Sequence, residues 1–271
     1  MKLIASLITH NEANRFLKPC IESLLGFCDE IRVLEDDSTD GTHKIISEMG
    51  AKVLRNDYRM FFEHEGRARQ KLLEWTMEGN PTHILAIDAD EFVADGQLLR
   101  AELEKPIEVL TMSERRRRSP RMTPPGVWSL QMQEIWGATE DVLNIRQDGG
   151  WKEHPVPIVF TVPPLEDRQA LRHWQIPDRA LACGRVPKEV GFRASRLRER
   201  PVTQILHYGW ACEKDRAARH ARYVEHDGGK HHAGSHLNSI MWSDNRVRIT
   251  EREWPESLAA AKAGLLARIN Q

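Results

Sequence analysis

The sequence has few cysteines, no long apolar run and almost no net charge. Its four cysteines show no CxxC spacing, which is typical of free thiols in a reducing compartment. No apolar stretch approaches the roughly 20 residues that a membrane-spanning helix needs. The apolar start, residues 1–9, meets polar residues too soon for a signal peptide. We therefore expect a cytoplasmic protein without an integral membrane segment.

The composition is that of a globular protein, with 40% hydrophobic and 29% charged residues in a chain of 271. This excludes a disordered, collagen-like or coiled-coil chain. The formal net charge of -1 hides an asymmetry. Residues 1–110 carry 13 basic and 21 acidic side chains, whereas residues 111–271 carry 26 basic and 19 acidic ones. The two parts therefore present different electric fields, and the second mildly favours an anionic partner.

Apolar runs alternate with helical patterns through the first hundred residues, which predicts an α/β fold around a parallel sheet. A basic loop is expected at 113–121, and no linker demands two independent domains. We expect residues 1–110 to form a nucleotide-binding α/β part and residues 111–271 an acceptor-binding part of one continuous domain. The sequence predicts strands at 2–9, 30–35, 51–55, 83–87, 127–132, 142–145, 156–162 and 203–208, and helices at 16–25, near 42–49, 66–77, 213–226 and 259–269.

An acidic cluster follows the predicted strand 83–87, with Asp88 and Asp90 separated by one alanine. In a parallel sheet, ligands bind at the carboxyl ends of the strands. Two aspartates placed there can both reach one hard divalent cation such as Mg²⁺ or Mn²⁺, which prefers oxygen ligands and commonly bridges to phosphates. The alternative is a solvated turn that caps the next helix, but an apolar strand running directly into carboxylates favours the metal site.

Short polar segments also follow the first two predicted strands. The first begins at Thr9 and continues to Glu12, and the second reads EDDSTDGT from Glu35 to Thr42. The chain lacks both GxGxxG and GxxxxGK[ST], so neither the dinucleotide fingerprint nor the P-loop applies. Each segment alone is compatible with an ordinary turn and helix cap.

Together these segments resemble the family 2 glycosyltransferases. The resemblance rests on the opening LIASLITHNEANRFLKPCIESL, on EDDSTDGT and on ILAIDADEF, which is similar to the DxD motif of that family. It covers about the first hundred residues. It implies a GT-A fold, a Rossmann-like nucleotide-binding sheet followed by a mixed acceptor-binding C-terminal part.

The resemblance also implies roles for individual residues. Thr9 and Glu12 would line the nucleotide pocket, and Asp36 would hydrogen-bond the base or ribose. Asp88 would contact ribose or a metal-bound water, and Asp90 would ligate the metal. The remaining nucleotide contact falls on Arg67 or Arg69, where HEGRARQK departs from the usual family pattern.

A metal held by aspartates and a diphosphate has room for another ligand, and His207 at the end of a predicted strand offers neutral imidazole. A core or surface role for His207 is the alternative. Attack by an acceptor hydroxyl needs a general base. Glu153, which follows a Gly-Gly-Trp segment, is the first candidate, although the family tends to show His before Glu where this chain has Glu153 before His154. Glu134 is the second candidate.

These features predict a metal-dependent, inverting glycosyltransferase that uses Mn²⁺ or Mg²⁺. Its donor would be a nucleotide diphosphate sugar, with a UDP-sugar as the first choice by family frequency. Its acceptor would carry a hydroxyl group on a glycan, a lipid-linked sugar, a protein or a modified nucleic acid. The alternatives are a phosphatase with an aspartate nucleophile, in which Asp88 would be phosphorylated, and an inactive scaffold that binds glycan or nucleotide.

Overall fold

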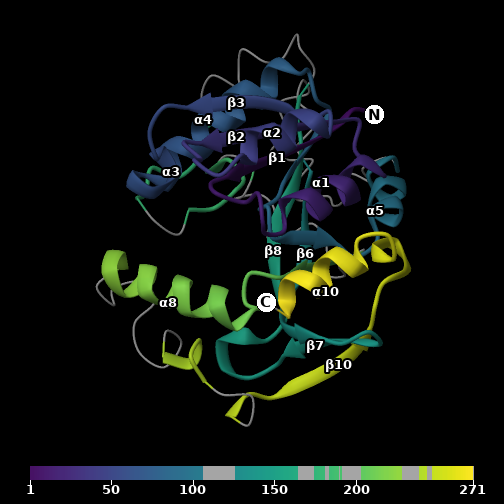
Figure 1. The fold of residues 1–271 in the computed structure, drawn as a ribbon. Coiled ribbons are helices and arrows are strands. Elements are labelled where there is room, and N and C mark those ends of the chain that lie inside the picture. Colours follow the sequence, from purple (N-terminus) through teal and green to yellow (C-terminus); the bar gives the residue numbers. More distant parts are fainter. Residues whose placement is uncertain are drawn as a thin grey trace, which may run out of the picture.

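The computed structural model describes residues 1–105, 126–163, 174–180, 183–188, 190, 203–227, 238–242 and 246–270. The basic loop predicted at 113–121 lies outside the described residues. Within the described part, no helix combines the length and the hydrophobicity that crossing a membrane requires. Figure 1 shows an α/β half at the top that is continued below by long strands and further helices.

The α/β half is built on parallel strands whose side chains are almost all buried. Its central strand β1 has the sequence LIASLIT, a continuous apolar run of the kind that parallel sheets bury on both faces. The sheet order here is β4-β1-β2-β3, and all three pairings are parallel. The strands are β1 (Leu3–Thr9), β2 (Glu30–Asp36), β3 (Lys52–Asn56), β4 (His83–Ala86) and the short β5 (Glu91–Val93).

Helices cover this sheet, and their ends are fixed by local hydrogen bonds. Asp95 caps one helix by accepting a 2.8 Å hydrogen bond from the backbone N–H of Leu98. Asp40 accepts a 3.0 Å bond from the N–H of Thr42 at the start of another, after Gly41 at φ 89°. The helices are α1 (Leu17–Leu25), α2 (Thr42–Glu48), α3 (Met60–Glu63), α4 (Glu65–Glu78) and α5 (Gly96–Leu103).

The second part of the chain extends the same sheet with antiparallel strands. β8 pairs antiparallel with β4, β6 with β8, β7 with β6 and β10 with β7, while β9 lies between β5 and β6. The largest hydrophobic core joins Leu7 of β1 to Leu130, Ile158 and Leu265. The elements are β6 (Val127–Ala138), β7 (Val142–Arg146), β8 (His154–Thr161), β9 (Gln204–His207), α8 (Glu213–Asp227), β10 (Ile249–Glu253) and α10 (Lys262–Ile269), with short 3-10 helices at Gly149–Trp151 and Glu256–Leu258.

The predicted α/β class is confirmed, and most predicted elements appear within a few residues of their expected bounds. Four helices and strands of the described residues were missed because they are short or polar, namely α3, α5, β5 and β10. β6 is longer than the predicted strand at 127–132, since its polar continuation pairs with β9.

One segment from the second part docks against the start of α4. The backbone N–H groups of Glu65 and Gly66 donate to the carbonyls of Ala180 and Arg179, at 3.0 and 2.9 Å. A Cβ on Gly66 would lie 2.4 Å from the carbonyl oxygen of Pro177. Only glycine therefore permits this close approach, which brings the following residues, Cys183–Lys188, toward the end of β4.

We expect Gly66→Ala to destabilise the protein by about 1–3 kcal/mol, because the added methyl group meets backbone atoms that must shift. Thermal unfolding measures this loss. Gly264→Ala in α10 is the matched control, since no atom lies within 4 Å of the added Cβ. A Gly66→Ala variant as stable as the control would contradict the close docking.

Candidate functional site

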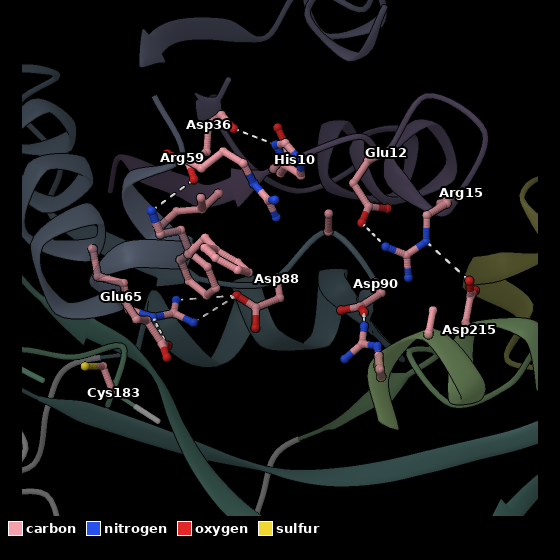
Figure 2. A pocket seen from close by; sticks show the side chains of 18 of the residues that line it. His10, Glu12, Arg15, Asp36, Arg59, Glu65, Asp88, Asp90, Cys183 and Asp215 are labelled. Carbon is pink, nitrogen blue, oxygen red and sulfur yellow. Dashed lines mark hydrogen bonds and ion pairs between the residues drawn. The ribbon is translucent and has the colours of Figure 1, made fainter. Parts of the chain in front are cut away.

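A cavity of about 630 Å³ opens at the carboxyl ends of β1, β2 and β4. Figure 2 shows that its charged side chains come from both parts of the chain, with the β-strand ends on one side and α8 on the other. The polar lining residues are Thr9, His10, Glu12, Arg15, Asp36, Arg59, Glu65, Arg69, Asp88, Asp90, Cys183, Arg185, Asp215, Arg219 and Tyr223.

Asp36, the last residue of β2, anchors one end of the cavity. Its carboxylate accepts a 2.6 Å hydrogen bond from the Asn56 side chain and a 2.9 Å bond from the backbone N–H of Phe61. Its carbonyl oxygen lies 2.6 Å from Nδ1 of His10, so that nitrogen carries the proton. The carboxylate therefore fixes the entry into α3 as well as facing the cavity.

Stacked aromatic and guanidinium groups line the same end. The Arg59 guanidinium lies 4.3 Å from the ring centroid of Phe62, and the Arg69 guanidinium lies 5.4 Å from that of Phe61. All four residues line the cavity. Flat faces of this kind are suited to a planar, polar group.

Asp88, two residues after β4, is held between two arginines. Its Oδ1 accepts 3.4 Å hydrogen bonds from both terminal nitrogens of Arg69, and its Oδ2 accepts a 2.9 Å bond from Arg185. Burial by itself would raise the pKa of Asp88, but the charges of Arg185 and Arg69 outweigh it and hold the pKa well below its usual value. Asp88 is therefore a carboxylate at neutral pH.

Arg185 is fixed by a second acidic residue. It donates to both carboxylate oxygens of Glu91, with 2.7 Å between Nη2 and Oε1. Glu91 is fully buried and also accepts a 3.0 Å bond from the backbone N–H of Asp88. Arg69 is fixed in the same way by Glu65, at 2.7 Å. Both guanidinium groups thus reach Asp88 already oriented by a second carboxylate.

Asp90 contacts two cationic side chains of the second part. Its Oδ2 accepts a hydrogen bond from Arg219, and its Oδ1 lies 3.6 Å from Nε2 of His207. The other ring nitrogen of His207, Nδ1, lies 2.5 Å from the Glu134 carboxylate. Sheet register explains this contact, because His207 on β9 pairs with Glu134 on β6. Burial alone would lower the pKa of His207, but the Glu134 carboxylate outweighs it and raises the pKa to about 9.

Asp90 and His207 together fit a divalent cation. A cation about 2.1 Å from each ligand atom can span the 3.6 Å between them. A carboxylate on the far ring nitrogen, as Glu134 provides, is the usual support for a metal-bound histidine. Among the described residues, no group of three or more His, Cys, Asp or Glu side chains is arranged to hold a metal. The protein thus offers two ligands, and bound groups or water would complete the shell.

A second charged network closes the α8 side of the cavity. Arg15 pairs with Glu12 and lies 3.6 Å from Asp215 of α8, whose carboxylate also accepts a 2.5 Å bond from Arg268. Burial raises the pKa of Glu12, and the nearby Arg15 charge only partly offsets this. The network ties the loop after β1 to α8.

The structure brings most of the predicted site residues together. Thr9, Glu12, Asp36, Arg69, Asp88 and Asp90 all line the cavity, and His207 lies behind Asp90. Between the two arginine candidates, Arg69 reaches the cavity, whereas Arg67 is exposed on α4 and is not among the lining residues.

The two candidates for the general base lie elsewhere. Glu134 is buried behind His207. Glu153 is exposed, is not among the lining residues, and accepts a 3.2 Å bond from the Gln204 side chain. The order Glu153-His154, which departs from the family pattern, places the acid just before β8 rather than in the cavity.

Several lining residues were missed from the sequence, namely Arg15, Arg59, Arg185, Asp215 and Arg219. Asp215 and Arg219 are four residues apart in α8 and so share a helix face. That spacing is the one sequence signal that could have predicted that both residues face the same site. The histidines His231, His232 and His236 lie outside the residues that the structure describes.

Comparison with known proteins supports the resemblance stated from the motifs. Residues 6–113 match the family model "Glycosyl transferase family 2". This match supports the predicted resemblance over residues 6–113, and the mixed α/β sheet confirms the predicted fold class. No curated protein matches the sequence.

Among solved structures, the chain is similar to glucosyl-3-phosphoglycerate synthase from Mycobacterium tuberculosis. One such structure is a complex with Mn²⁺, UDP and glucosyl-3-phosphoglycerate, and another is a complex with Mg²⁺ and UDP. In each case the identity is 24%, the match covers 34% of both chains, and the TM-score is 0.28. The chain thus matches about a third of the length of that protein.

We expect Glu134→Gln to change how the stability of the metal-free protein depends on pH. A histidine whose pKa rises from 6.5 to about 9 on folding stabilises the native state fully below pH 6.5, and this stabilisation is lost as the pH rises through 9. Without the Glu134 charge, the loss between pH 6.5 and 9 should shrink.

Thermal unfolding in a chelator at pH 6 and pH 9.5 measures this effect. Glu153→Gln is the matched control, since it makes the same chemical change at an exposed site. Equal pH dependence in the wild type and in Glu134→Gln would show that the carboxylate does not hold His207 charged.

Proposed function

Starting from the match of residues 6–113 to glycosyl transferase family 2, we propose that this protein is a metal-dependent glycosyltransferase that uses a nucleotide diphosphate sugar. The single observation that carries the proposal is the placement of Asp88 and Asp90. Both lie at the carboxyl edge of the parallel sheet, inside one cavity, and His207 stands 3.6 Å from Asp90.

The charges that line the cavity support the need for a cation. Among the described residues that line it, six carboxylates face five guanidinium groups. A donor diphosphate adds about two negative charges to a site that already has a carboxylate in excess, and buried charge of one sign is costly. A divalent cation restores the balance, which supports Mn²⁺ or Mg²⁺ as the cofactor.

Asp90 and His207 would hold the cation, and Asp88 would lie beside it with its two arginines. A bound divalent cation supplies Lewis acidity that neutralises charge on the departing nucleotide diphosphate. Arg69 and Arg185 keep Asp88 ionised and oriented. Their guanidinium groups are the planar, multidentate donors that phosphate oxygens favour.

The nucleotide would occupy the end of the cavity near Asp36. Thr9 ends β1 there, and its side-chain oxygen is buried without a hydrogen-bond partner among the described residues, while Glu12 lines the cavity nearer to α8. The Arg59 and Phe62 pair offers a flat face for a base. We keep a UDP-sugar as the first choice of donor, on family frequency.

The acceptor would carry a hydroxyl group on a glycan, lipid-linked sugar, protein or modified nucleic acid, and inversion at the sugar carbon follows from the family resemblance alone. Glu153 and Glu134 remain the sequence-based candidates for the base. A phosphatase with Asp88 as the nucleophile is disfavoured, because both carboxylate oxygens of Asp88 already accept bonds from arginines.

We expect Glu153→Gln to lower sugar transfer far less than the roughly 100-fold that losing a general base costs at minimum. The reason is its position outside the cavity. Single-turnover rates with a saturating donor measure the effect. A loss of 100-fold or more with unchanged donor affinity would return Glu153 to the catalytic role.

A thermal-shift panel of nucleotides and nucleotide sugars, with and without Mn²⁺, tests the proposal. A ligand that binds only the native state raises its stability by mass action, so the true donor should give the largest shift, and only with the cation. Asp90→Asn should abolish the Mn²⁺-dependent part of that shift and the turnover. Glu48→Gln, at an exposed position of α2, is the control.

Full turnover by Asp90→Asn would contradict the assignment of Asp90 as a metal ligand. Metal-independent nucleotide binding without transfer to any hydroxyl acceptor would instead identify an inactive binding scaffold.

A further inference from the structure

Arg219, on α8, pairs with the same Asp90 carboxylate that a metal ion would use, through the oxygen that does not face His207. One of its terminal nitrogens, Nη2, donates to Oδ2 of Asp90, while Oδ1 faces His207. Asp90 is 6% exposed, so its carboxylate requires a counter-charge. Figure 2 shows Asp90 on the side of the cavity that lies next to α8. The aspartate predicted to bind the cation is therefore already paired with a cation from the protein.

The position of Arg219 is built by the surrounding packing. Its guanidinium lies 5.1 Å from the ring centroid of Trp210, which packs edge-on against Trp151, also at 5.1 Å. A Cβ on Gly209 would lie 2.6 Å from the Arg219 guanidinium and 2.6 Å from Nε2 of His207. The backbone at Gly209 thus packs closely against both cationic groups, which lie next to Asp90.

A divalent cation on Asp90 and the Arg219 guanidinium would repel each other across one carboxylate. This repulsion weakens the contact between the guanidinium and Asp90, and the guanidinium lines the same cavity that would receive the donor. Its planar fork binds phosphate oxygens by two parallel hydrogen bonds.

We propose that Arg219 is a built-in counter-ion, which holds Asp90 in place until the cation arrives and then transfers to the donor diphosphate. The diphosphate half of this inference rests on the proposed function. The competition with the cation requires only that Asp90 binds a metal. Arg219 would make cation binding weak without the donor and stronger with it, because the donor takes over the displaced arginine.

The test removes the charge of Arg219 and measures Mn²⁺ binding by electron paramagnetic resonance, first without nucleotide and then with UDP. In Arg219→Gln, we expect Mn²⁺ alone to bind about tenfold more tightly, since no competing cation has to be displaced. UDP at saturating Mn²⁺ should bind about tenfold more weakly, because a phosphate contact is lost.

Arg219→Met is a second neutral variant that keeps the apolar stem on Trp210, and it should behave alike if Arg219→Gln does not fold. Arg219→Lys keeps the charge and should hold Mn²⁺ affinity within about threefold of the wild type. Lys214→Gln removes the same charge from an exposed position of α8 and should change neither affinity.

Unchanged or weaker Mn²⁺ binding by both neutral variants would overturn the counter-ion role while leaving the metal site intact. Failure of the wild type and all variants to bind Mn²⁺ would overturn the metal site and this inference together. Tighter Mn²⁺ binding with unchanged UDP affinity would overturn the transfer to diphosphate.

Discussion

The turn after β4 places two carboxylates where the sheet ends, the half-buried Asp88 and the buried Asp90, and both need a counter-charge. The surrounding structure supplies these counter-charges. Arg69 and Arg185 neutralise Asp88, and Arg219 with His207 neutralises Asp90. Three of these four cationic side chains come from the second part of the chain. The acidic turn is thus the point at which the two parts are joined electrostatically.

The same need for counter-charges explains how the cationic side chains around the site are held in place. Each cationic side chain at the turn is held by another group: Glu91 holds Arg185, Glu65 holds Arg69, and Glu134 holds His207. The Arg219 guanidinium packs against the Trp210 ring, next to the backbone of Gly209.

The sequence predicted the parts of this arrangement that are local. Residue order alone predicts the strand β1, the apolar run into Asp88 and the turn that begins at Asp36, because strands, turns and caps depend on near neighbours. The cavity brings Thr9, Asp36 and Asp88 together as expected, since parallel strands end at one edge. Within the eight-residue stretch HEGRARQK, pattern alone could not choose between Arg67 and Arg69; burial of one face of α4 does.

What the sequence could not supply is contact between distant segments. Glu91 reads as part of a solvated acidic turn, yet it is fully buried because Arg185, 94 positions away, pairs with it. The Glu134 and His207 pair depends on the register of β6 with β9, which no periodicity reveals. Glu153 was favoured by its neighbourhood in the sequence, and that neighbourhood lies outside the cavity.

The most direct measurement is the anomalous scattering of manganese in crystals grown with Mn²⁺ and UDP. Our account predicts one peak at bonding distance, about 2.1–2.3 Å, from both Asp90 and His207 and in contact with the UDP phosphates. UDP bound in the cavity with no manganese at those two side chains, or a peak held by other residues, would contradict it.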